Sequence, residues 1–350
     1  MSRSQDPQRP LFPFGNPIRM ILPKTSNLSP RLLAILNSFE ETMSERLKTL
    51  RPKDSENILS LSWMISALKS LSAIHNDVKS LITSLELAVS DWNEKWIDVY
   101  LDNSVKLLDV CIAFSSEISR LSQGHLFLKC SLHNLDCATP QQFTKARSSL
   151  DGWKQHVSSK NPRLQKCFGI LDDLINTLDL PKIKNSSKGK VLMHAMYGVR
   201  VVTVFICGVI AAAFSCSAEK LSDLKAPETC LWAEAFTNLQ VFGHGQIRNV
   251  LSTGKVTAIN ECYLVDASVM KLCRLTQHGD DTEAMRSSIT DLREGVDRLS
   301  QRLDLLAKEV DVFFQILLTG RNALLGNIRI GSDFSNSMQK NNYAEGPTVR

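Results

Sequence analysis

The sequence predicts an all-α protein, an elongated bundle of long antiparallel helices with a central, very apolar helix. Two observations predict this class. Apolar residues recur at steps of three and four over long stretches, which is the period of one helix face. Proline is absent from residues 53–139 and again from 228–346, and long helices need such gaps because proline breaks the helical hydrogen-bond ladder. No run alternates apolar and polar residues over the length of a convincing strand.

Composition narrows the class of protein further. The chain has 350 residues, of which 43% are hydrophobic, enough to fill a core. Its net charge of +5 is small for this length, so we expect no nucleic acid as a partner. The nine cysteines form no C-x-x-C pair and the seven histidines are scattered. We find no phosphate-binding loop, dinucleotide fingerprint or nucleophile motif, and therefore expect no catalytic residues, no cofactor and no metal.

Residues 1–28 form a proline-rich arm that we expect to be disordered. Six of the twelve prolines occur at or before Pro30, so regular structure is unfavourable there. Arg3, Arg9, Arg19 and Lys24 oppose a single Asp6, a composition with some likeness to a transit peptide. The prolines would interrupt an amphipathic helix, and a docking arm is the preferred interpretation.

Residues 29–180 are predicted to form the N-terminal helical region. Ser29 and Pro30 read as N-cap and first helical position of a helix that ends near Leu50. A second helix is expected to begin near Ser55, and a third to begin at a capping box of Asp91 and Glu94. Further expected features are a break near Gly124, a helix from Thr139-Pro140 to just before Asn161-Pro162, and a shorter helix over 164–180.

A basic linker over 181–190 precedes the apolar segment 191–218. Residues 201–218 carry no charge and would span about 27 Å as a helix, close to the thickness of a bilayer core. Candidate residues of the possible membrane segment are Val201, Phe205, Ile210 and Phe214. Arg200 and the many small residues oppose insertion, so a membrane span and a buried helix remain open alternatives. If the segment spans a membrane, the lysines before it place the N-terminal half in the cytosol.

Residues 219–329 are predicted to form a C-terminal helical region with a heptad seam. The seam alternates steps of three and four without interruption, through Ile289, Leu292, Val296, Leu299, Leu303, Leu306, Val310, Phe313 and Leu317. Ala307, Phe314 and Ile316 widen the apolar stripe, which favours packing inside one bundle over a two-stranded dimer. After about residue 330 the sequence turns polar, and 330–350 is predicted to be a disordered tail.

Two pairs of residues are candidate interaction or modification sites. Trp92 and Trp96 are candidate partner-binding residues, because aromatic side chains often anchor interfaces; core packing is the alternative for both. Ser148 and Ser149 follow Arg147 and are candidate phosphorylation sites, where added charge would recruit or release a partner.

Several blocks of sequence resemble the plant BYPASS family (BPS-like proteins). They are FPFGNP at 12–17, LSWM at 61–64, VSDWNEKWIDVYLDNSVKLLDVCIAFSSE at 89–117, LDLPKIKNSSKGKVLMHAMYGV at 178–199 and EVDVFFQILLTGRNALL at 309–325. The resemblance implies a largely helical, non-enzymatic regulator of root and shoot development, linked to restraint of a mobile signal derived from carotenoid metabolism. It transfers no catalytic residues.

From the residues and this resemblance we expect a regulator that signals by protein–protein contact. Related proteins in the family are tied to vesicle tethering, so the expected partners are exocyst-type tethering subunits or signalling adaptors. The first alternative is a membrane-anchored trafficking adaptor, and the second is an enzyme of carotenoid-derived signal metabolism. We expect a cytoplasmic and membrane-associated location, with the plastid as the alternative.

Overall fold

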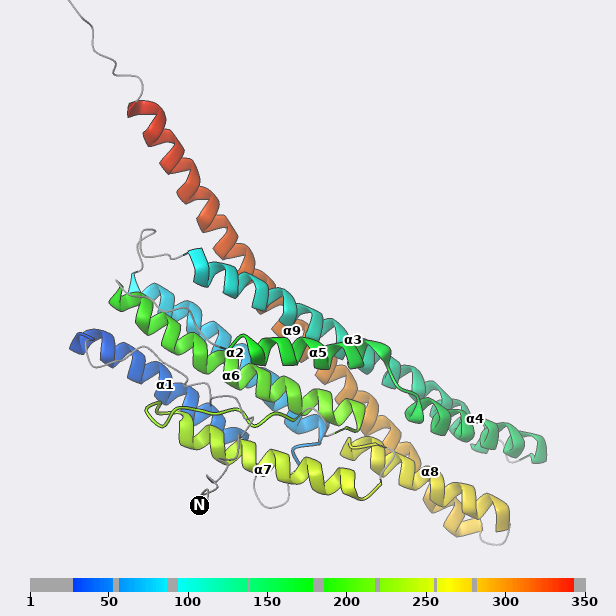
Figure 1. Cartoon of the computed structure of the whole chain (residues 1–350). Helices are drawn as coiled ribbons and strands as arrows, with labels where there is room; N and C mark the ends of the chain where they lie inside the picture. The colour runs from blue at the N-terminus through cyan, green and yellow to red at the C-terminus, as the bar shows by residue number, and fades with distance from the viewer. Residues whose placement is uncertain are drawn as a thin grey trace, which may run out of the picture.

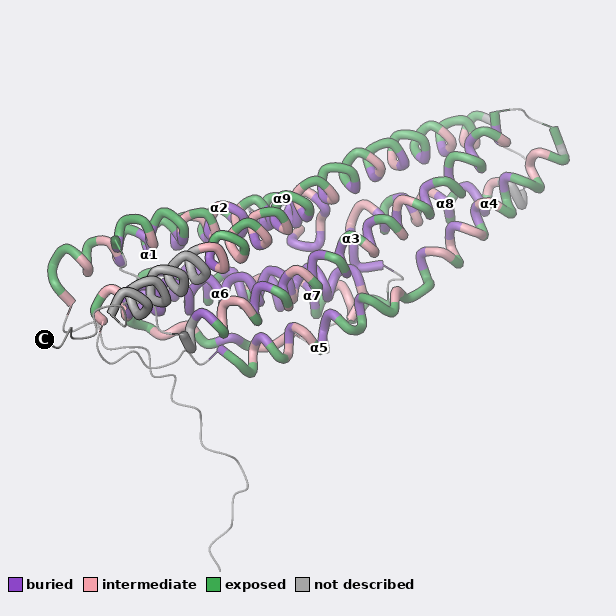
Figure 2. The backbone as a smooth tube through the Cα atoms, turned by 90° about the horizontal axis from the view of Figure 1, so that it is seen from above, coloured by how far each residue is buried: buried purple, intermediate pink, exposed green. Residues whose placement is uncertain are grey.

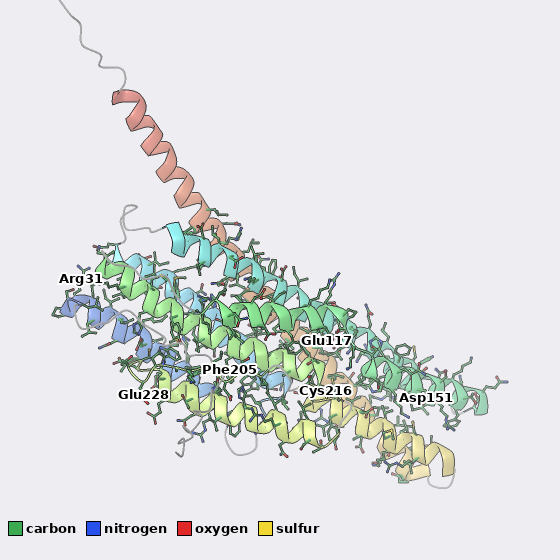
Figure 3. All side chains as sticks on the ribbon, viewed as in Figure 1. Arg31, Glu117, Asp151, Phe205, Cys216 and Glu228 are labelled. Atoms are coloured by element: carbon green, nitrogen blue, oxygen red, sulfur yellow. The ribbon has the colours of Figure 1, made fainter. Side chains whose placement is uncertain are left out.

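The structure is a computed structural model that describes residues 28–52, 57–86, 94–136, 139–178, 186–217, 221–254, 257–278 and 282–342. These residues form nine helices and no strand, which confirms the all-α class. The helices are α1 (Pro30–Leu50), α2 (Leu61–Leu85), α3 (Glu94–Asp136), α4 (Pro140–Ser158), α5 (Pro162–Asn176), α6 (Ser187–Ser215), α7 (Ala233–Ser252), α8 (Asn260–His278) and α9 (Thr282–Asn342). They pack into one elongated bundle (Figure 1). Arg31 on α1 and Asp151 on α4 lie toward opposite ends of it (Figure 3).

Helices α3 and α9 form an antiparallel pair that runs along the bundle. The guanidinium of Arg293 donates to Asp136 Oδ1 over 2.8 Å at one end of the pair, and Arg321 Nη1 donates to the carbonyl oxygen of Leu101 over 2.7 Å at the other. The heptad residues of α9 from Leu292 to Leu317 are all buried, so the predicted seam packs inside this chain. The helix continues to Asn342, beyond the point near residue 330 where we placed the start of the tail.

The first two helices begin where a serine caps them. Ser29 Oγ accepts a hydrogen bond from the backbone N–H of Leu32, as an N-cap residue should. The second helix begins at Leu61 and not near Ser55, because Ser60 Oγ accepts from the N–H of Trp63 and thereby satisfies one of the first free donors of α2. The capping box predicted at Asp91 falls outside the described residues, and α3 begins at Glu94.

The helix break predicted near Gly124 is wrong. The helix is continuous from Glu94 to Asp136, and Gly124 lies against α4. A Cβ atom added at Gly124 would lie 2.7 Å from His156 Cδ2 and 3.1 Å from Trp153 Cζ3. The glycine therefore allows two helices to approach closely, a role that its position in the sequence did not distinguish from a helix break.

A buried ion pair fastens α3 to the turn between α4 and α5. Glu117, only 1% exposed, accepts from Arg120 Nη2 at 2.6 Å and from Arg120 Nε at 3.0 Å. Asn161 Nδ2 also donates to Glu117, at 3.0 Å, and Arg120 Nη1 donates to Ser159 Oγ at 3.1 Å. Arg120 and Asn161 compensate part of the cost of burying the Glu117 carboxylate, and the bonds of Asn161 and Arg120 join α3 to the turn between α4 and α5.

Helix α6 is the central helix of the bundle. It begins at Ser187, inside the predicted linker 181–190, because Ser186 Oγ caps it by accepting from the N–H of Gly189. Helices α1, α2, α3, α5 and α7 pack around it. Figure 2 shows buried residues along α6 and on the inward faces of its neighbours, with exposed residues turned outward. Its burial therefore comes from this chain's own helices.

The remaining predicted boundaries depend partly on residues outside the described ranges. The arm 1–28, apart from Leu28, and residues 181–185 of the linker lie outside those ranges, as do the last eight residues. The division into regions 29–180 and 219–329 stays a prediction. Helices from both regions contribute side chains to one hydrophobic core. The backbone N–H of Asn260, at the start of α8, also donates to the carbonyl oxygen of Leu59 over 3.2 Å.

Candidate functional site

The structure describes the side chains of the two predicted phosphorylation sites and not those of the two predicted partner-binding tryptophans. Trp92 lies outside the described residues, and Trp96 lies in the first turn of α3 with a side chain that is also outside them. Ser148 is exposed on α4, and the hydroxyl of the half-buried Ser149 donates to the carbonyl oxygen of Lys145 over 3.1 Å. Partner binding at the tryptophans and phosphorylation at the serines stay predictions.

The four candidate residues of the possible membrane segment are all buried inside the bundle. Val201, Phe205, Ile210 and Phe214 have exposed fractions of 0%, 3%, 1% and 8%. Phe205 lies midway along α6, surrounded by the side chains of neighbouring helices (Figure 3). Among the described residues, α6 is the one helix long and apolar enough to cross a bilayer, and 83% of its most apolar stretch is buried within the chain. Core helices of soluble helical bundles share this length and composition, so these two properties do not distinguish a buried helix from a membrane span.

An apolar cavity of about 200 Å³ lies between α2, α3, α6 and α9. Its walls are mainly aliphatic and aromatic, with a few polar groups among them. The lining residues are His75, Val78, Lys79, Ile82, Tyr100, Asn103, Ser104, Leu107, Met196, Val199, Arg200, Ile316, Leu317, Gly320, Ala323 and Leu324. The cavity therefore suits an apolar molecule with a small number of hydrogen-bonding groups.

Asn103 is the most unusual polar group at this cavity. It is 6% exposed, and neither its amide nitrogen nor its amide oxygen has a hydrogen-bond partner among the described residues. A buried amide without partners is costly, so a bound molecule with both a donor and an acceptor would stabilise it. The sequence does hold a pattern that marks this residue. Asn103 shares a face of α3 with the buried Leu107, Val110 and Phe114 at helical spacing, which makes it a polar residue on an apolar face.

His75 and Arg200 are held by bonds to the protein itself. Thr203 Oγ1 donates to the carbonyl oxygen of Val199 over 2.6 Å, so it accepts from His75 Nε2 at 3.1 Å. Burial, and secondarily the charge of Lys79, lower the pKa of His75 to about 4, which keeps the ring neutral near pH 7. The buried Arg200 Nη2 donates to the carbonyl oxygens of Leu174 and Thr177, where its charge is favourable at the C-terminal end of α5.

A groove lies along the α3–α9 pair, next to α5. It is lined by Ile112, Ser115, Ser116 and Ser119 of α3, Arg163 of α5, and Asp311 and Phe314 of α9. The Ile112 side chain is 45% exposed, so an apolar group lies beside hydroxyls and charges of both signs. This combination of an apolar centre and a polar margin is typical of protein interfaces. The sequence alone does not reveal this groove, since it depends on how α9 lies against α3.

Comparison with known proteins identifies the family. The model of the family described as Protein BPS1 matches residues 67–328. The chain belongs to the BPS1 family. It is 50% identical over 329 residues to Protein BPS1, chloroplastic, of Arabidopsis thaliana, covering 94% of this chain and 93% of that protein. It is 43% identical over 276 residues to UPF0496 protein 4 of Oryza sativa subsp. indica, covering 78% and 60%. No solved structure matches the chain.

The family assignment confirms the resemblance to BYPASS proteins. A more distant relative is Protein ROH1D of Arabidopsis thaliana, 25% identical over 118 residues, 32% of this chain and 30% of that protein. Three of the five sequence blocks that carry the resemblance contribute residues to the cavity or the groove described above. Block 89–117 supplies Asn103 and Ile112, block 178–199 supplies Met196, and block 309–325 supplies Asp311 and Leu317. These three blocks, which are far apart along the chain, therefore lie near one another in the folded bundle.

Proposed function

We propose that this BPS1-family protein is a non-enzymatic regulator of plant root and shoot development that acts by binding other proteins. The observation that carries the proposal is the α3–α9 groove, where the exposed Ile112 lies beside three serines and the charged Arg163 and Asp311. Apolar and hydrogen-bonding groups side by side suit a protein segment that inserts one apolar side chain. The expected partners are signalling adaptors or exocyst-type tethering subunits.

The chemistry of the buried ionisable groups supports a non-enzymatic role. Cys111 and Cys167 are buried, and burial raises the pKa of each thiol to about 12. The reactive thiolate is therefore scarce near pH 7. His75, the histidine at the cavity, is neutral and its Nε2 proton is engaged with Thr203. These properties favour packing roles over proton transfer or nucleophilic attack, and so weigh against an enzyme of carotenoid-derived signal metabolism.

The cellular location is also a proposal. The Arabidopsis relative is called chloroplastic, which supports a plastid location for this chain. The burial of α6 by five neighbouring helices supports a role as a core helix, with any membrane association made through partners. A membrane-anchored trafficking adaptor with a cytosolic N-terminal half is the alternative, and it requires α6 to leave the bundle.

Ile112→Glu tests the contact proposal. We expect this variant to fold normally, since Ile112 is 45% exposed, yet to lose partner recovery and to fail in restoring root and shoot growth to plants that lack the protein. A buried carboxylate at an interface costs several kcal/mol, on the order of a hundredfold in affinity. The measurement combines co-purification from roots with complementation. The matched control is Val241→Glu on α7, where the wild-type side chain is 67% exposed.

The two variants together show whether a partner binds at the groove. Loss with Ile112→Glu and normal behaviour with Val241→Glu supports a partner at the groove. Full rescue and undiminished partner recovery by Ile112→Glu would rule out the groove as the contact surface.

A further inference from the structure

Three side chains of metal-ligand type converge at a buried point away from the cavity and the groove. They are Glu40 on α1, His194 on α6 and Cys230 in the turn before α7. His194 Nε2 lies 3.0 Å from Glu40 Oε1 and 3.4 Å from Cys230 Sγ. The ligand atoms of all three residues lie within 4.8 Å of one another. The sequence predicts no metal site here, since these three residues are far apart along the chain.

The cluster is shielded from solvent. The exposed fractions of Glu40, His194 and Cys230 are 3%, 4% and 4%. Burying a carboxylate requires compensation, and here a single hydrogen bond supplies part of it: the backbone N–H of Leu231 donates to Glu40 Oε2 over 2.7 Å. This bond also orients the carboxylate, as partners in the outer shell of metal sites do.

The two separations from His194 Nε2 are close to those between neighbouring ligands around a common centre. Glu40 Oε1 has no aligned hydrogen-bond donor, although His194 Nε2 is close to it. That nitrogen carries at most one proton, yet it lies near both Oε1 and Sγ. In a tetrahedral zinc site with ordinary bond lengths, neighbouring N and O ligands are about 3.3 Å apart and N and S ligands about 3.5 Å. The observed separations of 3.0 and 3.4 Å differ from these by a few tenths of an ångström.

We propose that Glu40, His194 and Cys230 bind a zinc ion that joins α1, α6 and the turn before α7. A site with one sulfur, one nitrogen and one oxygen donor matches the ligand preferences of zinc. Binding displaces the Cys230 thiol proton to solvent. The thiolate and the carboxylate then balance the two positive charges of the ion, so the loaded site is neutral in a buried environment. The surrounding bundle holds the three side chains in place before the ion arrives.

The zinc content of the full chain tests the proposal. The chain is expressed with zinc supplementation, dialysed against metal-free buffer and analysed by mass spectrometry for metals. We expect about one zinc ion per chain, and at least a tenfold weaker retention in Cys230→Ser, since even outer-shell changes cost about 10–100-fold in affinity. The matched control is Cys262→Ser, because Cys262 is another fully buried thiol and belongs to no such ligand cluster among the described residues.

Cobalt substitution adds a readout of the ligands themselves. Cobalt(II) bound in place of zinc gives a thiolate-to-metal charge-transfer absorption, which we expect in the wild type and in Cys262→Ser and not in Cys230→Ser. If Cys230→Ser fails to fold, thermal unfolding of the wild-type chain after treatment with a chelator takes its place. A decrease in Tm on chelation that is reversed by added zinc supports the site. A wild-type chain that retains no zinc after dialysis, or a Cys230→Ser variant with the same zinc content and cobalt absorption, overturns the proposal.

Discussion

Phe205→Ala is expected to lower the free energy of unfolding by about 3–5 kcal/mol, the range for removing a large buried aromatic side chain. Phe205 is 3% exposed at the middle of α6. Its ring meets the ring of Phe236 edge to face at a centroid distance of 5.5 Å and lies 5.9 Å from the ring of His244. Truncation removes these contacts and leaves a cavity where α6 meets α7, which the surrounding helices fill only in part.

Urea unfolding of the full chain, followed by far-UV circular dichroism, measures this loss. The control is Val241→Ala, also at an apolar position but 67% exposed on α7. We expect it to change the free energy of unfolding by less than about 0.5 kcal/mol. A loss below about 1 kcal/mol for Phe205→Ala would contradict the assignment of α6 as a packed core helix.

Acid is expected to destabilise the protein through His75. The pKa of His75 is lowered from 6.5 to about 4 in the folded chain, so the unfolded chain binds a proton more readily. The stabilising contribution of the neutral ring is therefore fully present above pH 6.5 and is lost as the pH falls toward 4. Each pH unit is worth at most 1.36 kcal/mol, so the total loss from this residue is about 3 kcal/mol.

His75→Gln isolates this contribution. Glutamine keeps a donor for Thr203 and does not titrate, so we expect the variant to lose less stability than the wild type between pH 6.5 and 4, by about 3 kcal/mol. His133→Gln is the matched control, since His133 is exposed on α3. Identical pH profiles of the free energy of unfolding for His75→Gln and the wild type would show that His75 is not held neutral by burial.

The helical architecture was predictable because it depends on local periodicity. The step of three and four that buries Leu292, Leu299 and Leu306 is written directly in the sequence and holds in the structure. Ser29 as N-cap is equally local. The predicted start near Ser55 differs from the observed start of α2 at Leu61. Two serines, Ser55 and Ser60, precede that helix, and only the folded backbone selects Ser60 as the cap.

The candidate sites were less predictable because they depend on contacts between distant segments. The Asn103 amide is unpaired in a cavity that side chains of α2, α6 and α9 help to form, and spacing along the chain does not reveal that arrangement. Glu40, His194 and Cys230 come from three elements that sequence spacing does not relate. The length and composition of α6 alone left a membrane span and a buried helix open, and the five helices that surround it account for its burial without lipid.

Hydrogen–deuterium exchange of the full chain in detergent-free buffer determines whether α6 is the buried core of a helical bundle in solution. We expect the amides of residues 201–214 to be among the slowest to exchange, opening only with the free energy of global unfolding. The exposed outer faces of α4 and α8 provide the comparison within the same sample. Rapid exchange over 201–214, or a chain that stays in solution only with detergent, would contradict that assignment of α6.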